Sequence, residues 1–171
     1  MSEDYRQTLL VCSTLLRYPD EGVIRYAQQL TSFIEELPLT PQRLLKKFLS
    51  FLKTTDVVTL QELYVSTFDM NDENSLYITY AKLKDDSARG SELQGLKSLY
   101  RSAGLSPTTE ELPDYLPMFL EYIGMSGADG AKQLLHSYTP LIVDLAIRLE
   151  RKGNPYALVV QASLEALRNI M

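Results

Sequence analysis

The sequence contains few side chains whose types and spacing suit catalysis. Its one histidine, His136, has no cysteine or paired carboxylates near it, so it cannot build a dedicated zinc site. The one cysteine, Cys12, follows Leu10 and Val11 and has no basic neighbour in sequence, which favours a buried, unreactive thiol. A Gly-rich phosphate loop and a G-x-S-x-G nucleophile motif are both absent from the sequence. None of these residues therefore indicates a catalytic site, a metal ligand or a bound cofactor.

Aromatic side chains are the chemical feature that stands out. Tyrosine occurs 11 times and tryptophan never. A tyrosine has a rigid apolar ring and a polar tip, which suits a surface that binds another chain. The alternative interpretation is that these rings belong to the core and only their hydroxyls reach its rim. The two clusters are Tyr64, Phe68, Tyr77 and Tyr80, and then Tyr115, Phe119 and Tyr122.

The segment 110–117 is the most constrained part of the chain, because two prolines enclose an aspartate and a tyrosine. Asp114 has the side chain of a helix N-cap. That cap would put Pro117 at the third helical position, where its missing N–H costs nothing. On this interpretation the segment needs no functional explanation.

The elements that must position these residues are predicted to be helices. Leucine occurs 30 times, whereas valine and isoleucine together occur 15 times, and this bias favours helices over strands. Apolar residues recur at helical spacing from residue 4 to residue 167. We predict an all-α fold, with one compact domain of about eight or nine helices over residues 1–171.

Local signals predict where several helices begin or break. A Ser or Thr before a helix can cap it, a Thr–Glu pair at capping-box spacing opens one, and an internal proline kinks or divides one. The residues 84–92 are polar and indicate either a loop or the solvated start of a helix. The expected caps are Thr40 (before Pro41), Thr59 (paired with Glu62) and Ser75, and a kink or division is expected at Pro140 within 127–150.

Charge and the N-terminal residues narrow the classes of partner. The formal net charge is −5, so the chain lacks the positive field that draws a protein to nucleic acid or to an anionic membrane. No window approaches the ~18 uninterrupted apolar residues of a membrane span, and the acidic N-terminus does not fit a signal peptide. The free cysteine fits a reducing compartment, so we expect a cytoplasmic protein with no nucleic-acid partner and no membrane insertion.

Several blocks of sequence resemble one family. Together they are similar, in order over residues 8–165, to the NarJ-type chaperones of respiratory nitrate reductase, part of the TorD/DmsD group of redox-enzyme maturation proteins. The blocks between residues 60 and 122 carry the most specific part of this resemblance. They are 62–69, 75–80, 96–101, 103–105, and 111–117 with its Pro-Asp-Tyr-Leu-Pro core, with 15–19, 89–90 and 120–122 in support.

The resemblance implies a TorD-like helical fold and a chaperone without enzymatic activity. Such a protein binds the apo catalytic subunit of a molybdoenzyme, through its N-terminal segment, until the molybdenum cofactor is inserted and before the membrane partner attaches. Helical chaperones of this shape can also exchange elements between chains, so a homodimer is open.

We combine this resemblance with the tyrosine clusters to predict a client-binding groove. Aromatic residues near 64–80 would form its apolar walls, with Asp114 and Tyr115 at its edge, where Asp114 would attract a basic client leader. The predicted client-binding residues are Tyr64, Phe68, Tyr77, Tyr80, Arg101, Glu111, Pro113, Asp114, Tyr115, Pro117 and Glu121.

Three other functions stay open from the sequence. A sister chaperone would serve another molybdoenzyme of the dimethyl sulfoxide reductase family, or proofread its twin-arginine leader. A small helical enzyme would need a buried titratable site that periodicity does not reveal. A helical adaptor would bind its partner whether or not that partner holds a cofactor.

Overall fold

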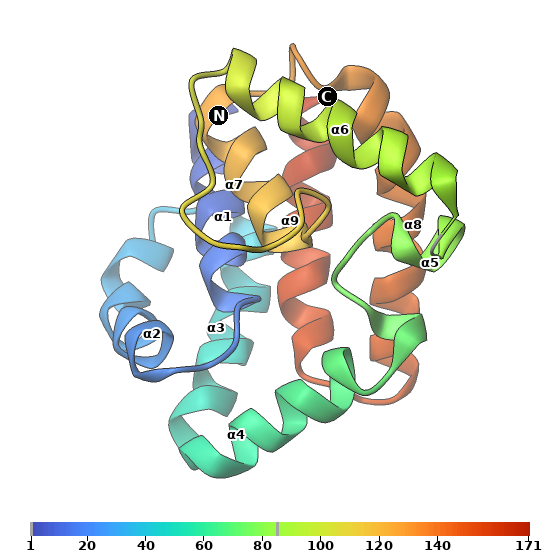
Figure 1. The fold of residues 1–171 in the computed structure, drawn as a ribbon. Coiled ribbons are helices and arrows are strands. Elements are labelled where there is room, and N and C mark those ends of the chain that lie inside the picture. Colours follow the sequence, from blue (N-terminus) through green and yellow to red (C-terminus); the bar gives the residue numbers. More distant parts are fainter. Residues whose placement is uncertain (1, 85) are drawn as a thin grey trace.

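The C-terminal helix, α9 (Tyr156–Ile170), lies at the centre of the computed structural model (Figure 1). It packs against three others: α1 (Ser2–Leu15), α3 (Leu39–Thr54) and α8 (Lys132–Arg151). A helix surrounded in this way must be apolar over most of its circumference. Its small and medium side chains, several of them alanine and valine, meet that requirement and are fully buried.

The structure describes residues 2–84 and 86–171, which form nine α-helices and no β-strand. One hydrophobic core runs through them, from Leu9 to Leu167. The all-α prediction is therefore confirmed. The remaining helices are α2 (Glu21–Ile34), α4 (Val57–Tyr64), α5 (Tyr80–Leu83), α6 (Ser87–Ser102) and α7 (Leu116–Ser126), with a π-helical turn η1 (Val65–Asp69) and a 3₁₀ turn η2 (Asp72–Asn74).

Two of the predicted helix starts are wrong by a few residues. The side chain of Asp56, not Thr59, caps α4, since its Oδ1 accepts a hydrogen bond of 3.0 Å from the Thr59 N–H. The helix therefore starts three residues earlier than expected, and Thr59 lies in its first turn, where its hydroxyl donates to Asp56 Oδ2 at 2.6 Å. Thr40 lies inside the first turn of α3, which begins directly after Pro38 without a side-chain cap.

The long helix α8 passes through Pro140 without a break, so the predicted division of this segment is wrong. Pro140 is exposed, whereas the apolar residues of the same helix are buried against α9. The buried face therefore continues on both sides of the proline and holds the two halves in one helix. The polar stretch around residue 87 is a helix start, since Asp86 Oδ1 accepts from the Ala88 N–H and caps α6.

The residues considered first for chemistry are inert. Cys12 is fully buried and its pKa is raised by desolvation, as expected for a small core residue. His136 is exposed on α8. Among the described residues, no three His, Cys, Asp or Glu side chains gather in a way that could hold a metal ion. None of the described helices is both long and apolar enough to cross a bilayer.

Helix α7 packs closely against α1, and a glycine on α7 makes this close contact possible. A Cβ atom added to Gly124 would lie 2.8 Å from Leu10 Cδ2 and 3.0 Å from the carbonyl oxygen of Arg6. From the same side, the Arg6 guanidinium donates from Nε to the Gly124 carbonyl at 2.9 Å and from a second nitrogen to the Met125 carbonyl. Arg6 thus fixes the C-terminal end of α7 on α1.

This crossing gives the first prediction. Gly124→Ala should destabilise the protein by about 1–3 kcal/mol, because the added methyl group overpacks the contact with α1. The matched control is Gly95→Ala in the exposed middle of α6, where an added Cβ meets no atom within 4 Å. There we expect a gain of about 0.5–1 kcal/mol from higher helix propensity. Urea unfolding of both variants measures the difference, and two changes of the same sign would contradict the tight crossing.

Candidate functional site

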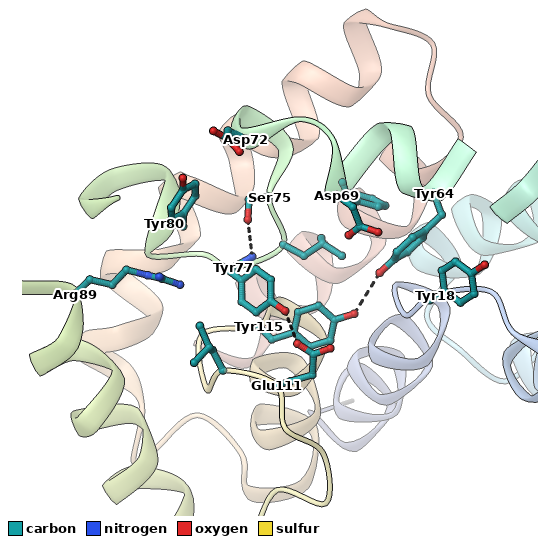
Figure 2. Close-up of a pocket in the computed structure, with 13 residues that line it drawn as sticks. Tyr18, Tyr64, Asp69, Asp72, Ser75, Tyr77, Tyr80, Arg89, Glu111 and Tyr115 are labelled. Atoms are coloured by element: carbon teal, nitrogen blue, oxygen red, sulfur yellow. Dashed lines mark hydrogen bonds between the residues drawn. The ribbon is translucent and has the colours of Figure 1, made fainter. Parts of the chain in front are cut away.

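Two irregular segments, 75–79 and 111–115, lie side by side and form the middle of a pocket (Figure 2). An isolated antiparallel bridge joins Tyr77 to Tyr115. On either side of it the Ile78 N–H donates to the Asp114 carbonyl at 3.0 Å, and the Leu116 N–H donates to the Leu76 carbonyl at 2.7 Å. This pairing keeps 75–79 out of a regular helix, so the helix expected from Ser75 onward is wrong and only Tyr80–Leu83 is helical.

A buried carboxylate holds the two segments to α6. Asp114 is 0% exposed, and its Oδ2 accepts from the Thr79 hydroxyl at 2.6 Å and the Thr79 N–H at 3.2 Å. Arg89 on α6 donates to the same oxygen at 3.2 Å and to the Thr79 hydroxyl at 3.1 Å. The three side chains form one closed network between three segments of the chain.

This network overturns two expectations for Asp114. It is not the N-cap of the following helix, since α7 begins at Leu116 after Tyr115 and has no side-chain cap, with Pro117 at its second position. It also does not lie at a groove edge where it could attract a client. Burial and the ion pair with Arg89 remove its charge from the surface.

Tyrosine rings form the walls of the pocket. Tyr77 and Tyr115 lie with ring centroids 5.4 Å apart, and the Tyr77 hydroxyl donates to Glu111. Tyr64 donates its hydroxyl hydrogen to the Leu16 carbonyl at 2.8 Å, so Tyr115 is the donor in the 3.2 Å contact between the two tyrosine hydroxyls. In Figure 2, Tyr64 and Tyr18 stand on one side of this pair, and Tyr80 and Arg89 stand on the other. The hydroxyls of Tyr64, Tyr77 and Tyr115 are thus paired within the protein, which leaves mainly ring surface facing the pocket.

The π-helical turn η1 also lines the pocket and forms part of its rim. It follows α4 directly and brings Phe68 to within 4.9 Å of Tyr64, measured between ring centroids. Turns of this type are rare in helices and are frequently found at functional sites. The next residue, Asp69, is exposed at the rim.

The pocket, called the tyrosine pocket below, has a volume of about 500 Å³ and opens to solvent. That volume is in the usual range for a site that encloses a ligand or several side chains of a partner. It is lined by Tyr18, Tyr64, Phe68, Asp69, Asp72, Ser75, Leu76, Tyr77, Tyr80, Arg89, Glu111, Leu112 and Tyr115.

Carboxylates give the rim of the tyrosine pocket a negative charge. Asp69, Asp72 and Glu111 are all exposed there, whereas the one cation of the lining, Arg89, is paired with Asp114. The pKa of Asp69 is raised, first by partial burial and then by the nearby charge of Glu111. Two carboxylates that repel each other beside aromatic faces favour a cationic or protonated group between them.

Six of the eleven predicted client-binding residues line this pocket, and five lie elsewhere. Pro113 and Pro117 are buried supports; the carbonyl of Pro113 accepts from the Tyr100 hydroxyl at 2.7 Å. Arg101 is exposed on α6, outside the pocket, and Glu121 on α7 pairs with Arg17 at 2.7 Å. The six in the pocket are Tyr64, Phe68, Tyr77, Tyr80, Glu111 and Tyr115, and Asp114 lies behind its wall.

Five lining residues that matter for the pocket were not predicted from the sequence. Four of them fall in blocks that carry the family resemblance, which is the signal that could have found them: Tyr18, Asp69, Arg89 and Leu112. Asp72 lies between the blocks 62–69 and 75–80, and no motif marks it. Their convergence depends on the packing of η1 and η2 beside 111–115, which no local pattern reveals.

Comparison with known proteins identifies the family of this chain. Residues 34–159 match the family described as "Nitrate reductase delta subunit". The chain belongs to this family. It is 34% identical over 98% of its length, and 91% of the relative's, to a Bacillus subtilis protein named "Probable nitrate reductase molybdenum cofactor assembly chaperone NarJ". The Escherichia coli NarJ is 29% identical over 92% of the chain and 68% of that protein.

A solved structure shows the same fold. The crystal structure of a protein from Archaeoglobus fulgidus, described as a redox enzyme maturation protein, superimposes with a TM-score of 0.70 over 95% of this chain and 93% of that one. The two sequences are 24% identical. The delta subunit family match, the near full-length NarJ relatives and this fold agree with the resemblance seen in the blocks between 60 and 122.

The Asp114 network gives the second prediction. Asp114→Asn should destabilise the protein by about 3–5 kcal/mol, because it leaves the Arg89 guanidinium, whose side chain is 12% exposed, without its counter-ion. The control is Glu121→Gln, which breaks an ion pair whose side chains are 40% and 44% exposed. That change should cost about 0–1 kcal/mol. Denaturant unfolding followed by circular dichroism compares them, and equal small losses would contradict a structural role for Asp114.

Proposed function

We propose that this protein is a dedicated assembly chaperone of respiratory nitrate reductase. It binds the catalytic subunit in the apo form, through an N-terminal segment of that subunit, and keeps it competent for molybdenum cofactor insertion before membrane attachment. It acts in the cytoplasm as a binding protein and not as an enzyme. The observation that carries the proposal is the 34% identity to a named nitrate reductase chaperone across 98% of the chain.

The tyrosine pocket supports this function by its shape and its lining. A chaperone of this kind needs an apolar groove with polar edges that accepts a segment of another chain. Aromatic rings from several segments supply the apolar surface, and the hydroxyls of Tyr64, Tyr77 and Tyr115 already have partners inside the protein. The three rim carboxylates add a preference for a segment that carries basic residues beside its apolar ones.

Capture of the client tests the proposal directly, and this is the third prediction. A tagged form, produced in its own host when molybdenum cofactor synthesis is blocked, should recover the nitrate reductase catalytic subunit without cofactor. Leu112→Ser should weaken recovery by about fivefold, because it removes about 1 kcal/mol of apolar contact at the pocket rim. Leu112 is already 39% exposed, so the fold should tolerate the change.

The matched control for this experiment is Leu39→Ser. Leu39 is 58% exposed at the start of α3 and lies outside the tyrosine pocket, so its recovery of the client should equal that of the wild type. Recovery of no molybdoenzyme subunit by the wild-type protein would contradict the proposal. Recovery of the catalytic subunit of another molybdoenzyme would keep the chaperone function and replace nitrate reductase as its client.

The pH dependence of binding gives the fourth prediction. A basic client segment needs the rim carboxylates in their charged form, and the raised pKa of Asp69 means that this group loses its charge at a higher pH than an ordinary aspartate. Affinity for a basic N-terminal peptide of the client should therefore fall as the pH is lowered from neutral, before ordinary carboxylates titrate.

Asp69→Asn should lower the neutral-pH affinity by roughly threefold and flatten this early part of the pH profile. Asp144→Asn, which removes an exposed carboxylate on α8, should change neither. Isothermal titration calorimetry at several pH values measures both variants. An Asp69→Asn profile that matches the wild type would show that the rim charge does not contact the client.

A further inference from the structure

Two further pockets continue from the tyrosine pocket along the surface. The first, here called the middle pocket, has a volume of about 410 Å³ and shares Tyr18, Glu111 and Tyr115 with the tyrosine pocket. The next, here called the methionine pocket, has about 250 Å³ and shares Arg17, Thr109 and Met118 with the middle pocket. Because each neighbouring pair has walls in common, the three hollows lie in series.

The methionine pocket is built to take an apolar side chain. Its floor is formed by Tyr100 and Tyr122, whose ring centroids are 4.9 Å apart and which are both buried. Met118 and Met125 stand at its sides, and Met125 is 50% exposed. Methionine side chains are flexible and polarisable, so they adapt to the shape of a bound side chain.

An ion pair stands where the middle and methionine pockets meet. Arg17 donates from one terminal nitrogen to Glu121 at 2.7 Å, and both side chains are partly exposed. Such a pair contributes about 0–1 kcal/mol, so its opening is cheap. The Arg17 Nε is buried without an acceptor, which is unfavourable for a hydrogen-bond donor. Movement of the guanidinium group to make room for a bound peptide would remove this cost. The divide between the two pockets is therefore weak.

The charges along the three pockets indicate what occupies them. Their linings include five carboxylates, from Asp20, Asp69, Asp72, Glu111 and Glu121, and two guanidinium groups. Both guanidinium groups are in ion pairs, Arg17 with Glu121 and Arg89 with Asp114. The surplus of negative charge excludes an acidic segment and fits a basic one with apolar side chains.

We propose that the three pockets form one furrow that holds a continuous stretch of the client, and that the methionine pocket is a second anchor site for an apolar side chain of that stretch. The occupant is the basic, apolar N-terminal segment of the catalytic subunit, so this inference rests on the function proposed above. The tyrosine pocket holds one part of the segment, the middle pocket holds its backbone, and the chain continues past Arg17 to the second anchor.

A peptide length series tests the furrow. Synthetic peptides start at the N-terminus of the host's nitrate reductase catalytic subunit, increase in length, and each carry one tryptophan, which can be excited selectively because this protein has none. Affinity should rise in two separate steps as the peptide reaches first one anchor site and then the other. The second step should be about tenfold, the effect expected from burying one apolar side chain.

Variants decide where the second step arises. Met125→Glu should remove the second step and leave the first unchanged, because it puts a charge at the methionine pocket only. Val58→Glu is the matched control, since Val58 is 63% exposed on α4 and outside the furrow, and it should preserve both steps. Thermal unfolding of both variants checks that they are folded.

Two results would overturn the furrow while leaving the proposed function intact. One is a single rise in affinity with peptide length, which would confine the client to one pocket. The other is a second step that persists in Met125→Glu, which would place the second anchor elsewhere. If the wild-type protein binds none of the peptides, N-terminal client recognition is itself wrong and the furrow fails with it.

Discussion

The arrangement of the tyrosine pocket depends on one buried carboxylate. Asp114 accepts hydrogen bonds from Thr79 and from Arg89, and so joins the 111–115 segment to the 75–79 segment and to α6. Neither segment is helical, and their backbones pair at a single bridge. A single bridge would be marginal alone, so the buried network supplies the interaction that fixes Tyr77 against Tyr115. The pocket thus depends on a residue that does not face it.

This dependence explains what the sequence could and could not reveal. Most of the helices follow from the spacing of apolar residues, because a helix face is a local property of the chain, whereas the short α5 buries no residue and does not. The interpretation of Asp114 as an N-cap used the same local logic and was wrong. Its real partners, Thr79 and Arg89, lie 35 and 25 residues away in sequence. Spacing over a few residues carries no information about such partners, and only the family resemblance brought all three blocks together.

The tyrosines show why the choice between core and surface could not be made from the sequence. Tyr64 and Phe68 are nearly buried and pack against Tyr156 of the central helix, yet they also line the pocket. Tyr77 and Tyr115 are more exposed. Each of these rings therefore belongs partly to the core and partly to the site. A large aromatic ring can serve both because one edge is packed while the opposite face stays accessible.

The internal pairing of the tyrosine hydroxyls has a consequence for how a client would be held. Because Tyr64 donates to Leu16 and Tyr77 donates to Glu111, those hydroxyl hydrogens need no partner from the client. Contact with the walls is then mainly apolar burial, which is not directional and tolerates variation in the bound segment. The rim carboxylates would then determine which segment binds and in which orientation. Exposed charges of this kind affect the association rate and the alignment of the bound segment more than its affinity. A client held in this way would bind with moderate strength, which the proposed release of a finished subunit requires.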